Sequence, residues 1–196
     1  MADSLYLSLW FPSADTVEIL PRAVSVMQQF PFSKERPGVT YIAVHPVSWA
    51  EATVFERRFD PGITPGEALQ VAADLLNEDY AYSFEAHWDL WSPENPRHEW
   101  LLQPSRVKFL IYGKEFERAN PEEGDIEIDF GLDSPFLYEE LHLSPQDENR
   151  LKDNVQQLVK FTSAAETSSG ASGRLLWSES EENLAQKLIS RLQKVQ

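Results

Sequence analysis

The segment Tyr80–Trp91 constrains the fold more than any other, because two sets of alternate residues run through its whole length. The first set is mostly apolar and consists of Tyr80, Tyr82, Phe84, Ala86, Trp88 and Leu90. The second set consists of Ala81, Ser83, Glu85, His87, Asp89 and Trp91. Successive side chains of a strand point to opposite faces of a sheet. The segment therefore predicts a long strand with one buried face, and Glu85, His87 and Asp89 stand in a row on the other.

Glu85, His87 and Asp89 are candidate ligands of a divalent metal, because imidazole and carboxylate groups bind zinc, manganese and iron. Residues two apart on a strand are separated by about 7 Å, so three of them on one strand are too far apart to hold a single ion. At most two of the three could bind the same metal. The competing interpretation, which we favour, is a solvated or interface strand face with a charge-paired histidine.

The first half of the chain predicts three further strands and two helices. Strand patterns cover Ser4–Phe11, Val39–Val47 and Thr53–Phe59, and helical patterns cover 14–30 and 64–79. The order β-α-β-β-α-β over residues 1–92 is that of a ferredoxin-like α+β unit. In a sheet of that order the second and fourth strands lie at opposite edges, so we expect His45 and His87 to be well separated.

The second half predicts another α+β unit over residues 99–196, after a proline-bounded linker at 93–98. Strand patterns cover Arg106–Phe116, Asp125–Leu132, Arg174–Ser178 and a shorter stretch at Phe136–Leu141. Helices are expected from Ser144 and from Glu181, while the small polar residues 162–173 indicate a mobile loop. We therefore expect two α+β lobes, built mainly from antiparallel sheets and packed together. If both sheets carry helices on one face only, packing of their bare faces would enclose a cavity that suits a ligand.

The charge of the chain argues against nucleic acids and anionic membranes as partners. Seventeen basic residues against thirty-two acidic ones give a net charge of −15, whereas both of those partners select a basic surface. The absence of cysteine excludes disulfides and thiolate chemistry. The first fifteen residues lack both a basic region and a long apolar run, so they predict neither a secretion signal nor a membrane span. We expect a soluble, cytoplasmic protein.

An aromatic group is expected on the sheet face opposite the helices. Its members are Tyr6, Trp10, Tyr41, His45 and Trp91. Aromatic side chains on such a face stack on bases in some RNA-binding modules, but those modules also carry basic residues. In this acidic chain we expect the group to contact the second lobe, a protein partner or another copy of the chain.

No stretch of the sequence matches a catalytic signature, so enzymatic activity stays open. The acidic row Asp125, Glu127 and Asp129 does not fit a calcium-binding loop, which needs glycine at the sixth position and glutamate at the twelfth. We predict a non-catalytic module without a cofactor, which binds a protein partner or itself through the aromatic face. The alternative is a metal- or ligand-binding enzyme or sensor, in which His87 is a base or metal ligand oriented by Glu85 or Asp89.

Overall fold

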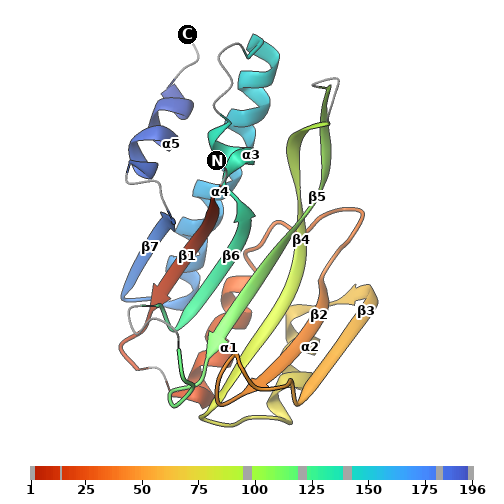
Figure 1. The fold of residues 1–196 in the computed structure, drawn as a ribbon, viewed down its shortest axis with the longest axis vertical. Coiled ribbons are helices and arrows are strands. Elements are labelled where there is room, and N and C mark those ends of the chain that lie inside the picture. The colour runs from red at the N-terminus through yellow and green to blue at the C-terminus, as the bar shows by residue number, and fades with distance from the viewer. Residues whose placement is uncertain are drawn as a thin grey trace.

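One antiparallel sheet of seven strands forms the centre of the described part of the chain (Figure 1). The computed structural model describes residues 3–13, 15–94, 99–118, 123–138, 143–179 and 183–193. The strands are β1 (Ser4–Trp10), β2 (Val39–Pro46), β3 (Phe55–Ile63), β4 (Tyr80–Glu94), β5 (Glu99–Tyr112), β6 (Ile126–Leu132) and β7 (Gly173–Ser178). Their order across the sheet is β3-β2-β4-β5-β6-β1-β7.

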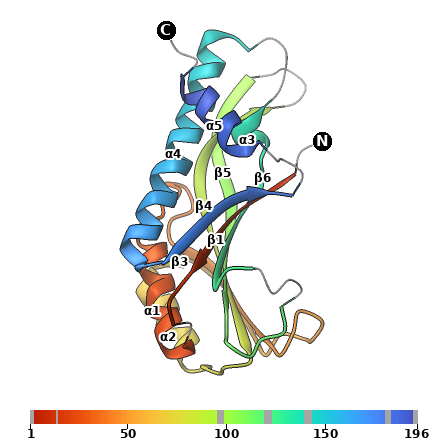
Figure 2. The ribbon, with the colours of Figure 1, turned by 90° about the vertical axis from the view of Figure 1, so that its left-hand side faces the viewer.

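The helices cover one face of this sheet, as Figure 2 shows for α1, α2 and α4. The helices are α1 (Thr16–Met27), α2 (Pro65–Ala73), α3 (Ser134–Leu137), α4 (Pro145–Ser169) and α5 (Leu184–Gln193). Alternate strand residues and the inward stripes of the helices form the core between them, including Leu7, Ile42, Phe84, Phe109, Ile128, Met27, Val155 and Phe161. Within the residues described, no helix combines the length and the apolar character needed to cross a membrane.

The α+β class is confirmed, but the ferredoxin-like arrangement is not, because the strand order differs. In a ferredoxin-like unit β4 would pair with β1. Here both edges of β4 are occupied by β2 and by β5, which forms a hairpin with β4 along its whole length. β1 lies between β6 and β7 instead.

Strands from both predicted lobes, 1–92 and 99–196, belong to this one sheet. The predicted division therefore does not correspond to two separate sheets. Around the predicted linker, Pro93 and Glu94 still pair with Trp100 and Glu99, and residues 95–98 lie outside the described residues.

Several local predictions also change. Residues 60–62, whose Asp-Pro-Gly sequence is typical of a turn, extend the predicted strand Thr53–Phe59 as part of β3, because β3 is an edge strand and an edge tolerates proline. No strand begins at Phe136, where one was expected over Phe136–Leu141, because Phe136 and Leu137 belong to the short helix α3. Residues 139–142 lie outside the described residues. The helix expected after Thr64 is confirmed, with Thr64 and Glu67 forming a capping box.

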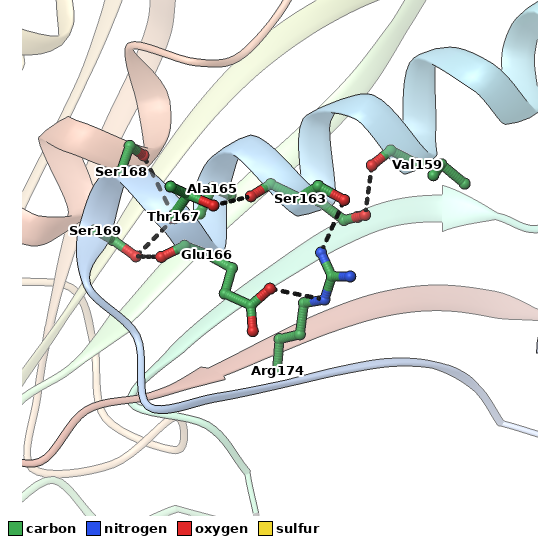
Figure 3. Close-up of polar contacts among 9 residues, drawn as sticks. Val159, Ser163, Ala165, Glu166, Thr167, Ser168, Ser169 and Arg174 are labelled. Carbon is green, nitrogen blue, oxygen red and sulfur yellow. Dashed lines mark hydrogen bonds and ion pairs between the residues drawn. The ribbon is translucent and has the colours of Figure 1, made fainter.

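The predicted loop at 162–173 is mostly helix, since α4 continues to Ser169. Its hydroxyl groups bond to helix carbonyls, so that Ser169 donates to the Ala165 carbonyl at 2.6 Å and Thr167 to the Ser163 carbonyl at 3.0 Å (Figure 3). Arg174 of β7 holds the same turns through an ion pair with Glu166 at 3.1 Å. These contacts and the burial of one helix face outweigh the weak helix propensity of serine and threonine.

Candidate ligand-binding site on the open face of the sheet

The open face, defined here as the sheet face opposite α1, α2 and α4, carries a row of side chains that crosses all seven strands. From β3 to β7 the row consists of Arg58, Tyr41, Glu85, Lys108, Asp129, Tyr6 and Trp177. Charges of opposite sign stand on neighbouring strands, with Lys108 between Glu85 and Asp129, an arrangement that stabilises a sheet modestly. The row gives the open face a charged character that the helix-covered face lacks.

A second row, next to the first, contains mostly smaller side chains. It consists of Glu56, Ala43, Ser83, Leu110, Glu127, Ser8 and Leu175. Glu127 is only 7% exposed, and one of its carboxylate oxygens has no described hydrogen-bond partner. Burial raises the pKa of Glu127 to about 7, and the nearby acids Glu123 and Asp129 act in the same direction.

A pocket of about 480 Å³ opens on this face where β2, β3, β4 and β5 meet the segment 33–37. The segment lies beside β4 just before β2 begins, because the Ser33 amide donates to the His87 carbonyl at 2.6 Å. Gly38 makes the turn between them with a φ of 78°, and a side chain there would lie 2.5 Å from the Ile63 carbonyl oxygen. The pocket is lined by residues that include Arg36, Thr40, Arg58, Glu85, His87 and Arg106.

His87 forms the floor of this pocket and is 8% exposed. Its Nδ1 lies 3.4 Å from the Thr40 hydroxyl, and its Nε2 lies 3.4 Å from Nη1 of Arg36. The Thr40 hydroxyl donates its proton to the Glu85 carbonyl at 3.3 Å, so its oxygen accepts from Nδ1–H of the imidazole. Nε2 is therefore the unprotonated nitrogen and accepts from Arg36.

The pKa of the His87 imidazole lies below its ordinary value, which favours the uncharged form. Burial is the largest cause that lowers its pKa, followed by the positive charge of Arg36. Glu85 opposes this shift and Arg106 adds to it. The group thus acts as a neutral hydrogen-bonding partner at the back of the pocket.

The three metal candidates are separated by their partners. Glu85 pairs with Arg106 at 3.4 Å, while Asp89 accepts from the backbone amide of Lys34 at 3.1 Å. Glu85 and His87 share the pocket, but Asp89 is not among its lining residues. Across the described ranges no group of three or more histidine, aspartate or glutamate side chains is placed to hold a metal ion.

The aromatic candidates are engaged one by one with neighbouring side chains. Tyr6 stacks on Trp177 with ring centroids 4.6 Å apart. Tyr41 donates from its hydroxyl to Glu56 at 2.8 Å, and the guanidinium of Arg58 lies over its ring. Alternation with the buried residues Leu7 and Ile42 places both tyrosines on the open face.

The remaining aromatic candidates lie in three different places. Trp10 stands at the end of β1 opposite Gly173, and His45 packs against Trp49 with ring centroids 4.7 Å apart. Trp91 lies beside α4, because Arg150 covers its ring and its backbone bonds to Asn154. The five residues therefore do not form one patch.

The predicted separation of His45 and His87 has a different cause from the one expected. β2 and β4 are neighbours rather than opposite edges, and His45 stands opposite Ala81. Ala81 is six residues from His87 on β4, about 20 Å by strand rise. His45 is therefore far from His87 along the strands, not across the sheet.

Arg36 and Arg106 are pocket residues that the sequence did not single out. Arg36 lies in the segment before β2, and Arg106 stands opposite His87 on β5. Arg58, the third arginine of the pocket, comes from the predicted strand Thr53–Phe59. The meeting of these arginines depends on the strand order, which no local pattern encodes.

Among family models, curated proteins and solved structures, none matches this chain.

Proposed function

We propose that this protein is a non-catalytic binding protein that takes a small ligand on the open face of its sheet. The pocket beside His87 carries the proposal. Its volume of about 480 Å³ lies within the range of about 300–1,000 Å³ that is usual for small-molecule sites. Four strands and the segment 33–37 supply its lining, so hydrogen-bonding groups are presented from a rigid framework.

The contacts of His87 favour binding over acid–base catalysis. A catalytic histidine is commonly oriented by a carboxylate, with its other nitrogen directed at the proton that it transfers. In this pocket Nδ1 meets the Thr40 hydroxyl, and Nε2 is occupied by the guanidinium of Arg36. The nitrogen that would accept a proton therefore faces a positive charge.

The row on the open face disfavours one way in which a second copy of the chain could cover it. A dimer with the two open faces in contact, about an axis parallel to the strands and over β5, would place the row over itself in reverse order. Glu85 would then face Asp129, and Lys108 would face its own copy. The net charge of −15 adds a general repulsion.

The protein partner predicted for the aromatic residues remains a second candidate. The stack of Tyr6 on Trp177 lies next to Leu175, which is 52% exposed, so the β7 end of the open face has apolar surface to offer. The pocket is the stronger observation, because it combines concave shape with hydrogen-bonding groups.

A nuclear magnetic resonance titration of the isotope-labelled protein with a library of small metabolites tests the proposal. We expect ligands that shift the imidazole signals of His87 while those of His45, on the same face but about 20 Å away along the strands, stay unchanged. His87→Gln should weaken the binding of these ligands, followed through the backbone amide signals of the segment 33–37, and His45→Gln should leave the shifts of His87 intact. Ligands that perturb His45 alone, or none that perturb His87, would contradict the proposal.

A further inference from the structure

We propose that the pocket beside His87 binds an oxyanion, a carboxylate or phosphate group of a small molecule, through Arg36, Arg58 and Arg106. This inference rests on the proposed function and names the chemistry of its ligand. The three arginines come from the segment 33–37, from β3 and from β5, and all three line the pocket. Guanidinium groups match the planar, doubly accepting geometry of carboxylates and the oxygens of phosphates.

Two of the three arginines have donors available for a ligand. Arg58 lies over the ring of Tyr41 at 5.2 Å and forms no ion pair with any carboxylate in the described ranges. The guanidinium of Arg36 contacts a neutral acceptor, Nε2 of His87, at 3.4 Å. A positive charge with a neutral partner has more to gain from an anion than one that is already paired.

Arg106 is paired, but weakly. Its Nη1 lies 3.4 Å from Oε1 of Glu85, and the arginine side chain is 58% exposed. Exposed ion pairs contribute little to stability, so an incoming anion can share this guanidinium at low cost. Arg106 stands directly opposite His87 on the neighbouring strand, which directs it to the same end of the pocket.

Three carboxylates, Glu35, Asp60 and Glu85, also line the pocket. Of these, Glu85 alone pairs with one of the three arginines among the described residues. The acids lower the net charge of the pocket to zero, so an anion binds through directed hydrogen bonds to Arg36 and Arg58 rather than through a diffuse positive field. They also define the opposite hypothesis, a cationic ligand, which the experiment includes.

His87 provides a readout that is specific to an anion. The charged groups around its ring are Arg36 from the segment 33–37, Arg106 from β5 and Glu85 from its own strand, while Arg58, Asp60 and Glu35 complete the pocket wall. Protonation of Nε2 would oppose the charge of Arg36. An anion bound between Arg36 and His87 removes that repulsion, so it raises the pKa of His87.

Calorimetric titration with sodium citrate, sodium pyrophosphate and spermidine, each at constant ionic strength, tests the inference. Citrate supplies the carboxylate, pyrophosphate the phosphate, and spermidine the opposite charge. We expect at least one anion to bind and spermidine not to bind. Arg58→Gln should weaken the binding about tenfold, as expected for one charge-assisted hydrogen bond, and Arg36→Gln with Arg58→Gln should abolish it.

Arg57→Gln is the matched control, because it removes the same charge from the neighbouring position of β3. The side chain of Arg57 lies over the ring of Phe59 and is not part of the pocket lining. We expect less than a twofold change in affinity for this variant. Equal losses for Arg57→Gln and Arg58→Gln would overturn the inference, because they would reflect net charge alone.

The pKa of His87, followed by its imidazole signals, completes the test. Saturation with the anion should raise it in the unsubstituted protein. Binding of spermidine, an unchanged His87 pKa, or no binding of either anion would overturn the inference. If uncharged metabolites still shift His87 in the library titration, the proposed function stands and the anion chemistry alone fails. If no ligand shifts His87, both fail.

Discussion

The two faces of the sheet are built from alternate residues of the same strands, yet they differ in almost every property. On β5, Phe109 is buried under the helices with Val107 and Ile111, while Lys108 belongs to the charged row of the open face. The covered face must exclude water, so its side chains are apolar on the central strands, and arginines stand on it at the edge strands, Arg57 on β3 and Arg174 on β7. The open face has no such requirement, and it holds the arginines, acids and histidine from which a binding site can be made.

Substitution of neighbouring residues on β5 is the strongest test of the difference in packing between the two faces. We expect Phe109→Ala to lower the free energy of unfolding by about 3–5 kcal/mol, because it leaves a cavity among packed rings. Lys108→Ala should change it by no more than about 0.5 kcal/mol. Urea denaturation measures both. Similar losses for the two variants would show that the open face is as tightly packed as the covered face.

Contacts between α4 and the carboxyl-terminal end of β4 show how far the covered face extends. The Asn154 side chain of α4 accepts from the Trp91 amide at 2.9 Å and donates to the carbonyls of Trp91 and Pro135, both at 2.8 Å. We expect Asn154→Ala to destabilise the protein by about 2–4 kcal/mol, because buried backbone groups lose their partners. Asn149→Ala, at an exposed position of the same helix, should be nearly neutral. Amide exchange of Trp91 reports the local effect, and an unchanged rate in Asn154→Ala would exclude this role.

The carboxyl group of Glu127 is buried although it belongs to the open face. Its pKa of about 7 lies above the ordinary value of 4.5. As the pH rises through this interval, the unfolded chain ionises first, so the native protein loses stability, and the loss is complete above about pH 7. Glu127→Gln does not titrate there. The free energy of unfolding of Glu127→Gln, relative to that of the unsubstituted protein, should therefore be about 1–3 kcal/mol higher at pH 8 than at pH 4. Denaturation curves at the two pH values measure this gain, and a difference independent of pH would show that Glu127 is solvated.

Strands and helices were predicted well where the sequence has a clear periodicity. The alternation of Tyr80–Trp91 and the helical pattern that starts at Thr64 act over a few residues, and the strand and the helix that they predicted are both confirmed. The helical stretch up to Ser169 was missed, because hydroxyl-rich residues favour loops unless their hydroxyls find carbonyls and their neighbours find a core.

The site was partly foreseen for the same reason. Glu85 and His87 stood out because they share a strand face, which alternation alone predicts. Arg36, Arg58 and Arg106 join them through the pairing of β3, β2, β4 and β5, and such long-range order depends on the energy of the whole sheet. Sequence patterns placed residues on faces, while the strand order decided which of them meet.

The position of β1 also has a consequence for how the chain folds. Its neighbours β6 and β7 lie far along the sequence, so Leu5, Leu7 and Leu9 find their sheet partners only after residues 126–132 and 173–178 have been synthesised. Until then the apolar residues of β1 lack their pairing strands. Such distant contacts slow folding and lengthen the time during which a nascent chain is exposed to aggregation. Because β1 pairs with strands that are distant in sequence, the sheet can be completed only after β7 has been synthesised.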